Sequence, residues 1–87
     1  MANFSDFRLK RLLFLSQRRG TQENDLLLGR FAERNLGTLG PEELDQFEAL
    51  LAVEDAKLFR WITGQSPTPP EHATPVMQMI IRFNEEN

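Results

Sequence analysis

Two arginines, two carboxylates and a glycine gather in the short stretch "RRGTQEND", which contains Arg18, Arg19, Gly20, Glu23 and Asp25. The planar guanidinium group of an arginine suits a bidentate contact with a carboxylate of another molecule. Because glycine has no side chain, another backbone can approach closely at Gly20. These residue types, at this spacing, point to a polar contact surface for another protein rather than to a catalytic site.

Each of these residues also has a purely structural interpretation. Gly20 suits the left-handed position that ends many helices. Arg18 and Arg19 would lie in the last turn of one helix, where cations are favoured, and Glu23 in the first turn of the next, where anions are favoured. On residue types alone this structural interpretation is the stronger one, so a functional assignment needs a further signal.

The rest of the chain offers little catalytic chemistry. Its single histidine, His72, lies in a proline-rich connection, where we expect a solvated side chain rather than a general base. Without cysteine, and with one histidine, the sequence excludes cysteine-based and histidine-rich metal sites. None of the common phosphate-binding or hydrolase motifs occurs. We therefore predict a binding module with no catalytic residue and no metal site.

Length and charge further limit the classes of protein to which the chain can belong. With 87 residues, 40% of them hydrophobic, we expect one small folded domain over residues 1–87. The net charge of −3 argues against a general attraction to nucleic acid. Residues 1–40 nevertheless hold seven Arg or Lys against four Asp or Glu. We expect this local basic surface to contact a partner protein or solvent.

The elements that would position the charged stretch are helices, because the apolar spacing is helical nearly everywhere and no stretch alternates like a strand. We predict five short helices, which begin near Ser5 as an N-cap, Thr21 or Gln22, Pro41, Asp55, and Thr74 or Pro75. Gly20, Gly37 and Gly64 would follow three of them, and the last would end near Phe83 before a frayed tail. The predicted fold is a compact all-α bundle.

The apolar stripes of these helices define the predicted core. It includes the leucines of the second helix and the two aromatic residues Phe59 and Trp61, although Trp61 is also considered as a partly exposed anchor for a partner. The full set is Leu9, Leu12, Leu13, Leu26, Leu27, Leu28, Phe31, Ala32, Leu44, Phe47, Leu50, Leu51, Leu58, Phe59, Trp61, Ile62, Val76, Ile80 and Phe83, with Ser16 on the same face and Met77, Met79 and Ile81 flanking.

The segment "RRGTQENDLLLGRF" resembles the signature of the small succinate dehydrogenase assembly factors. The Arg-Gly-x-x-Glu core of that family is met by Arg19, Gly20 and Glu23. Asp25 matches the acidic residue two positions later, and Arg18 matches a frequent extra arginine. A motif this short is weak by itself, so the rest of the chain has to support it.

The resemblance continues outside the motif. Arg11 matches a basic position in the family's first helix, and the later "EDAKLFRWITG" places Leu58, Phe59 and Trp61 at the L-F-x-W positions of its fourth helix. The proline-rich link and the final short helix fit as well, so the resemblance covers nearly the whole chain. Asn24 departs from the pattern, because the family usually has an apolar residue there, and we expect different packing at the start of the second helix.

The resemblance implies a five-helix bundle that binds the flavoprotein subunit of succinate dehydrogenase and, in bacteria, also that of fumarate reductase. It implies a helper that promotes covalent attachment of FAD to a histidine of that partner, so the chain is not expected to be an enzyme or to hold a cofactor stably. The implied partner-binding residues are Arg11, Arg18, Arg19, Gly20, Glu23 and Asp25. We expect a monomer that selects a partner conformation with flavin and histidine at reacting distance.

Other functions stay open at this stage. One is a regulatory partner, such as the soluble antitoxin of a membrane-associated toxin, a label that some family members have carried. A helical nucleic-acid binder would use the basic N-terminal half, and a flavin-binding enzyme would capture free FAD. No run of apolar residues is long enough for a membrane span. We expect the bacterial cytoplasm, or the mitochondrial matrix in a eukaryote, with the basic "FSDFRLKRLLFL" as the first helix rather than a targeting peptide.

Overall fold

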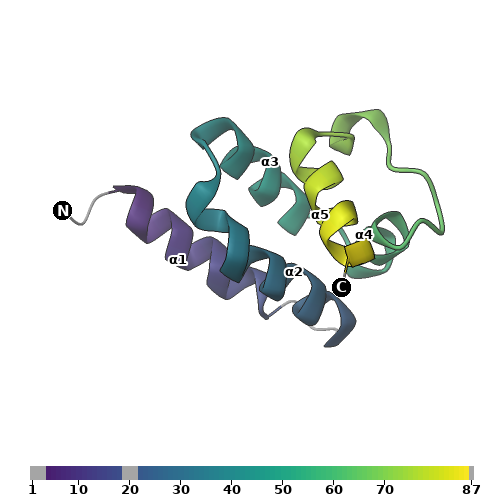
Figure 1. Ribbon diagram of the computed structural model, residues 1–87, viewed down its shortest axis with the longest axis horizontal. Helices are drawn as coiled ribbons and strands as arrows, with labels where there is room; N and C mark the ends of the chain where they lie inside the picture. Colours follow the sequence, from purple (N-terminus) through teal and green to yellow (C-terminus); the bar gives the residue numbers. More distant parts are fainter. Residues whose placement is uncertain (1–3, 19–21, 87) are drawn as a thin grey trace.

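Five α-helices make up most of the computed structural model, which describes residues 4–18 and 22–86 (Figure 1). They are α1 (Phe4–Ser16), α2 (Gln22–Asn35), α3 (Pro41–Leu51), α4 (Asp55–Ile62) and α5 (Pro75–Glu86). Two single-turn 3₁₀ helices, Leu36–Thr38 and Pro70–His72, lie in the connections. These described segments contain no β-strand, so the predicted all-α bundle of five helices is confirmed.

Local sequence signals explain where three of these helices begin or end. Pro41 opens α3, and the Gly40 N–H donates to the Glu43 side chain at 3.0 Å. Thr74 caps α5, since its hydroxyl oxygen accepts a hydrogen bond from the Met77 N–H at 3.2 Å. After α4 the chain turns at Gly64, whose φ of 79° is open to glycine at little cost. These are the start and stop residues that the sequence predicted.

Two predicted boundaries are wrong. α1 already includes Phe4, so Ser5 lies within the helix instead of capping it. α5 continues through Asn84 to Glu86, because no proline or glycine follows Phe83 to stop it. Gly20, predicted to close the first helix, lies outside the described residues.

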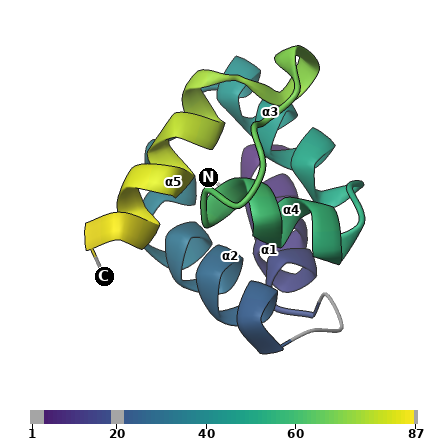
Figure 2. The ribbon, with the colours of Figure 1, turned by 90° about the vertical axis from the view of Figure 1, so that its right-hand side faces the viewer.

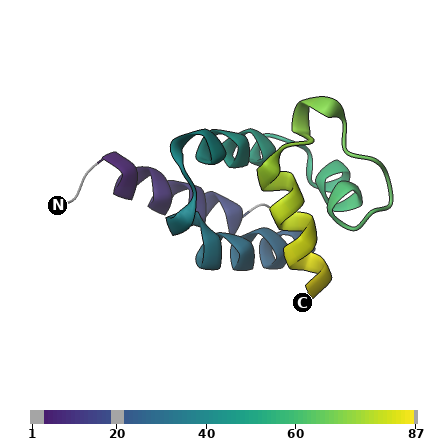
Figure 3. The same ribbon diagram turned by 45° about the horizontal axis from the view of Figure 1, so that its top comes forward.

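α1 packs along α2 and also contacts α3, while α4 and α5 contact α2 and each other (Figures 1 and 3). The close approach of the first two helices is visible at Gly29 of α2, where an added Cβ would come within 3.0 Å of the Gln17 side chain. Figure 2 shows α4 beside α5 and above the beginning of α2. The start of α2 therefore lies where α4 and the end of α1 come together.

The core draws on all five helices. At its centre the rings of Phe31 from α2 and Phe47 from α3 stack with centroids 6.0 Å apart, and Phe83 from α5 meets Phe31 edge-on at 5.7 Å. The buried set is Leu12, Leu28, Phe31, Ala32, Leu36, Leu39, Leu44, Phe47, Leu50, Leu58, Ile62, Val76, Met77 and Ile80.

Two residues that we predicted to be core are not. Leu26 is 49% exposed, and Phe59 is only half-buried outside the main cluster. Successive helical residues point about 100° apart, so three leucines in a row cannot all face the same core. Leu28 is fully buried, Leu27 is half-buried, and Leu26 is left facing outward. Trp61 is half-buried against the core, as its predicted packing role requires.

Candidate functional site

The predicted partner-binding residues lie around the connection between α1 and α2. Arg19 and Gly20 are outside the described residues. Arg18, which follows α1, and Glu23, in the first turn of α2, are both exposed. Asp25 is half-buried and takes part in an interaction within the chain.

Arg18 is supported by an aromatic ring. Its guanidinium carbon lies 5.0 Å from the ring centroid of Phe14, one turn earlier in the chain, in a cation–π arrangement. Phe14 is itself 56% exposed, so both groups face solvent. The contact keeps a charged group at the end of α1 without neutralising it, because the ring carries no net charge.

Arg11 takes part in an ionic cluster between α1 and α3. It lies 3.3 Å from a carboxylate oxygen of Glu48, and Arg8 reaches the other oxygen of the same carboxylate at 3.1 Å. Arg8 also bridges to Asp45. The hydrogen bond that Arg8 donates to Asp45 is the main cause that raises the pKa of Arg8 above its ordinary value, which favours the charged guanidinium. Arg11 remains 63% exposed and can still contact another molecule.

Asn24, next to Glu23, is fully buried. Its side-chain amide donates to the backbone oxygen of Asp55 at 2.9 Å and lies 3.1 Å from the Asp55 carboxylate. At this position, where we expected unusual packing, the side chain ties the first turn of α2 to the first residue of α4. Its own oxygen is buried, and no described residue donates a hydrogen bond to it. The link fixes the backbone from which Glu23 projects.

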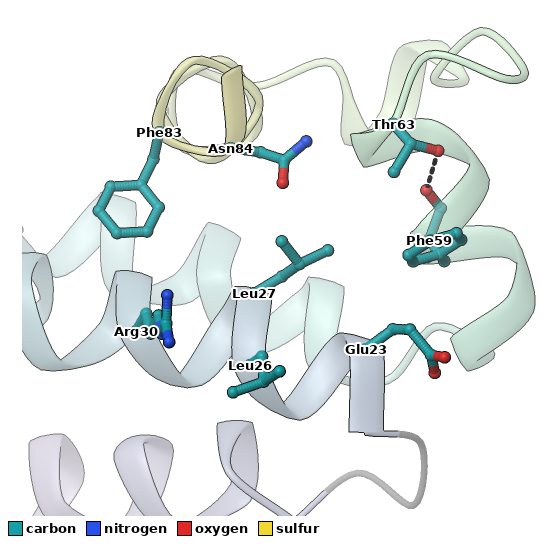
Figure 4. A pocket seen from close by; sticks show the side chains of 8 residues that line it. All are labelled: Glu23, Leu26, Leu27, Arg30, Phe59, Thr63, Phe83 and Asn84. Atoms are coloured by element: carbon teal, nitrogen blue, oxygen red, sulfur yellow. Dashed lines mark hydrogen bonds between the residues drawn. The ribbon is translucent and has the colours of Figure 1, made fainter. Parts of the chain in front are cut away.

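Glu23 stands at one end of a hollow between three helices, which we call the α2–α4–α5 groove (Figure 4). The groove has a volume of about 360 Å³. It is lined by Glu23, Leu26, Leu27, Arg30, Phe59, Thr63, Phe83 and Asn84. Glu23 and Phe59 also border a smaller depression of about 220 Å³, together with Asp55 and Ala56.

Sequence reasoning did not find this groove. One signal was available, because the run of leucines at Leu26–Leu28 was bound to leave one of them exposed. No local signal could have paired that leucine with Phe59 and Phe83, which come from helices much later in the chain. The interpretation of Phe59 as a core residue therefore missed its role as a groove wall.

Other expected features can be located as well. His72, expected to be solvated, is half-buried, and its ring centroid lies 5.6 Å from that of Trp61. Within residues 4–18 and 22–86, no group of three or more acidic, histidine or cysteine side chains is arranged to hold a metal ion. None of the helices described is both long enough and apolar enough to cross a bilayer.

Comparison with known proteins identifies one family, both from a family profile and from individual relatives. The profile of a protein family described as "Flavinator of succinate dehydrogenase" matches residues 10–84. The chain is 40% identical over 74 residues to the FAD assembly factor SdhE of Acetobacter pasteurianus, an alignment that covers 85% of this chain and 68% of the relative.

Mitochondrial relatives match over a similar stretch. The succinate dehydrogenase assembly factor 2-A of Drosophila mojavensis is 40% identical over 75 residues, which is 84% of this chain and 48% of that protein. The corresponding factor 2 of Dictyostelium discoideum is 39% identical over 71 residues, 82% of this chain and 50% of that protein. The chain thus spans about half the length of the mitochondrial relatives it matches.

Proposed function

The chain belongs to the family of flavinators of succinate dehydrogenase, and we propose that it promotes covalent attachment of FAD to a histidine of that enzyme's flavoprotein subunit. The proposal extends to the flavoprotein of fumarate reductase. The observation that carries it is that Arg18 and Glu23 are both exposed. Glu23 is the acid of the Arg-Gly-x-x-Glu motif, and Arg18 directly precedes the arginine of that motif. In this proposal the chain holds no FAD of its own, because the flavin and the histidine both belong to the partner.

The proposed role is to bind and orient, not to react. Glu23 and Arg18 offer opposite charges to the partner, and Asn24 holds the first turn of α2 in place through Asp55. A factor that binds one conformation of its partner more tightly than the others shifts the population toward it. Holding two reacting groups in the right geometry can supply effective concentrations of about 10⁵ M or more, so no catalytic group in the chain is required.

A reconstituted assay tests this proposal. The purified flavoprotein subunit is incubated with FAD, with and without the chain, and the flavin that stays attached after denaturation is measured by its fluorescence in a gel. We expect the chain to accelerate attachment in this assay. In the cell, we propose that it acts as a monomer in the bacterial cytoplasm or the mitochondrial matrix. Equal rates with and without the chain, for the flavoproteins of both enzymes, would show that it is not a flavinator.

A matched pair of substitutions tests whether faster flavin attachment depends on Glu23. Glu23→Gln removes the charge of the motif's acid, whereas Glu33→Gln makes the same change at an exposed position elsewhere on α2. We expect the first variant to slow attachment by about tenfold or more and the second to behave like the wild type. If both variants are fully active, Glu23 has no part in the contact with the flavoprotein.

A further inference from the structure

Apolar side chains from three helices are gathered, but not covered, in the α2–α4–α5 groove. Leu26 and Leu27 come from α2, Phe59 from α4 and Phe83 from α5 (Figure 4). Leu26 is about half exposed and the other three are half-buried. Single exposed apolar residues are ordinary, but a cluster that lines a hollow marks a place where another molecule can exclude water.

Two opposite charges lie at the rim of the groove, so an elongated occupant would bind in one orientation. Glu23 and Arg30 lie two turns apart on α2, about 10 Å along the helix axis, with Leu26 and Leu27 between them. Both are exposed, and neither forms an ion pair with any described residue. A complementary segment would place a basic residue opposite Glu23, an acidic residue opposite Arg30, and apolar side chains between them.

The polarity of the lining favours a helical occupant. The Thr63 hydroxyl already donates to the Phe59 backbone oxygen at 2.8 Å, which leaves the Asn84 amide as the other uncharged polar side chain of the lining to pair with an extended backbone. An extended chain would place unpaired N–H and C=O groups against leucine and phenylalanine, whereas a helix satisfies those groups internally. In a helix, residues seven positions apart repeat the separation of Glu23 and Arg30.

A second apolar surface, on the outside of α1, is a weaker candidate. It carries the exposed rings of Phe7 and Phe14, but the nearby charges of Arg8 and Arg11 are already paired with Asp45 and Glu48. Arg18 beside Phe14 adds a cation that no described acid neutralises, so the unmatched charge of that surface is of one sign and would not set the direction of a partner segment. The α2–α4–α5 groove offers both signs and contains Glu23 of the motif.

We propose that the α2–α4–α5 groove binds an amphipathic helical segment of the flavoprotein subunit, oriented by a base opposite Glu23 and an acid opposite Arg30. The inference rests on the proposed function, because it takes the occupant from the same partner. It goes further by adding Leu26, Arg30 and Phe59 to the contact surface. It also predicts the sequence pattern of the partner's segment, an apolar stripe with a base and an acid seven positions apart.

Cross-linking from inside the groove tests the proposal directly. The chain has no cysteine, so Leu26→Cys creates a unique attachment point for a photo-activated cross-linker, and Arg82→Cys creates a matched point on the exposed part of α5 outside the groove. Each labelled chain is mixed with the flavoprotein subunit and irradiated, and the joined peptides are identified by mass spectrometry. We expect position 26, and not position 82, to join a helical segment with the predicted pattern.

Binding measurements with unlabelled variants supply an independent readout. Leu26→Gln is expected to weaken binding to the flavoprotein by about tenfold, and Arg30→Glu by about fivefold with a slower association rate. Arg82→Glu, the same charge reversal on α5, should change binding by less than about twofold. Unchanged melting temperatures, followed by circular dichroism, would show that the variants still fold.

The outcomes separate this inference from the proposed function. A stable complex without cross-links from position 26, and with full affinity for Leu26→Gln, overturns the groove assignment alone. Cross-links between two copies of the chain would instead make the groove a self-association surface. Binding of free FAD that Leu26→Gln abolishes would make it a flavin site. If the wild-type chain does not bind the flavoprotein at all, the proposed function and this occupant both fail.

Discussion

The α1–α3 face and the α2–α4 junction hold their helices together in opposite ways. At the α1–α3 face, Arg8 and Arg11 pair with Asp45 and Glu48 in an ionic cluster open to solvent. At the α2–α4 junction the link is the uncharged, fully buried amide of Asn24 on Asp55. Screened charges contribute little net stability, whereas a buried hydrogen bond is costly to break. The junction therefore matters more for folding.

The two regions also differ in which charged side chains they leave free to contact a partner. At the α1–α3 face, Arg8 and Arg11 form ion pairs within the molecule, although Arg11 stays exposed enough to contact a partner. At the junction the neutral amide makes the tertiary contact, and neighbouring Glu23 stays exposed. A charged group in the place of Asn24 would need a buried partner of opposite sign. The amide allows helix packing and partner binding to use adjacent residues without competing for the same charge.

Asn24→Asp should break the junction most severely. The new carboxylate would be fully buried against the Asp55 backbone oxygen and carboxylate, with loss of both donated hydrogen bonds. We expect a loss of about 3–5 kcal/mol in the free energy of unfolding at pH 7, measured by urea titration. Asn84→Asp adds the same charge at a half-buried position of α5 and should cost about 0.5 kcal/mol. Similar losses for the two variants would contradict the assigned role of Asn24.

Asn24→Ala should have the next largest effect. It removes the donated hydrogen bonds without adding a charge, so the expected loss is about 1–3 kcal/mol in the same titration. Flavin attachment should also slow, because the first turn of α2 is no longer tied to α4. A variant as stable as the wild type would mean that water or a rearranged side chain replaces the amide.

Arg8→Ala should affect stability less than either change at Asn24. The Arg8 side chain is 26% exposed and pairs with the more exposed carboxylates of Asp45 and Glu48, so its removal should cost about 1 kcal/mol or less. The difference from the wild type should shrink further in 1 M NaCl, where exposed charges are screened. A loss larger than that of Asn24→Ala would reverse the ranking of the two regions.

Glu23→Gln should have the smallest effect on stability. The side chain is exposed and has no ion pair among the described residues, so the free energy of unfolding should change by about 0.5 kcal/mol or less. The same variant is expected to slow flavin attachment strongly. Thermal unfolding and the attachment assay on one preparation would show whether stability and function separate at this residue. If both fall together, Glu23 is a structural residue.

Local rules predicted most of the fold. Pro41, Thr74 and Gly64 act on their own neighbourhoods, and the structure uses each of them as expected. The resemblance to a known family located the motif, but its residues Arg19 and Gly20 remain a prediction. The long-range contacts were beyond local rules, because the Asn24–Asp55 link joins positions 31 residues apart and the Arg8–Asp45 pair joins positions 37 apart. The groove was missed for the same reason.

The packing of Trp61 beside His72 has a practical consequence. Trp61 is the chain's only tryptophan, half-buried with its ring centroid 5.6 Å from that of His72 in the proline-rich link. Indole emission shifts to longer wavelength when water reaches the ring, so detachment of the link from α4 has an intrinsic spectroscopic signal. Circular dichroism follows the helices instead, which allows a single thermal scan to distinguish release of the link from melting of the bundle.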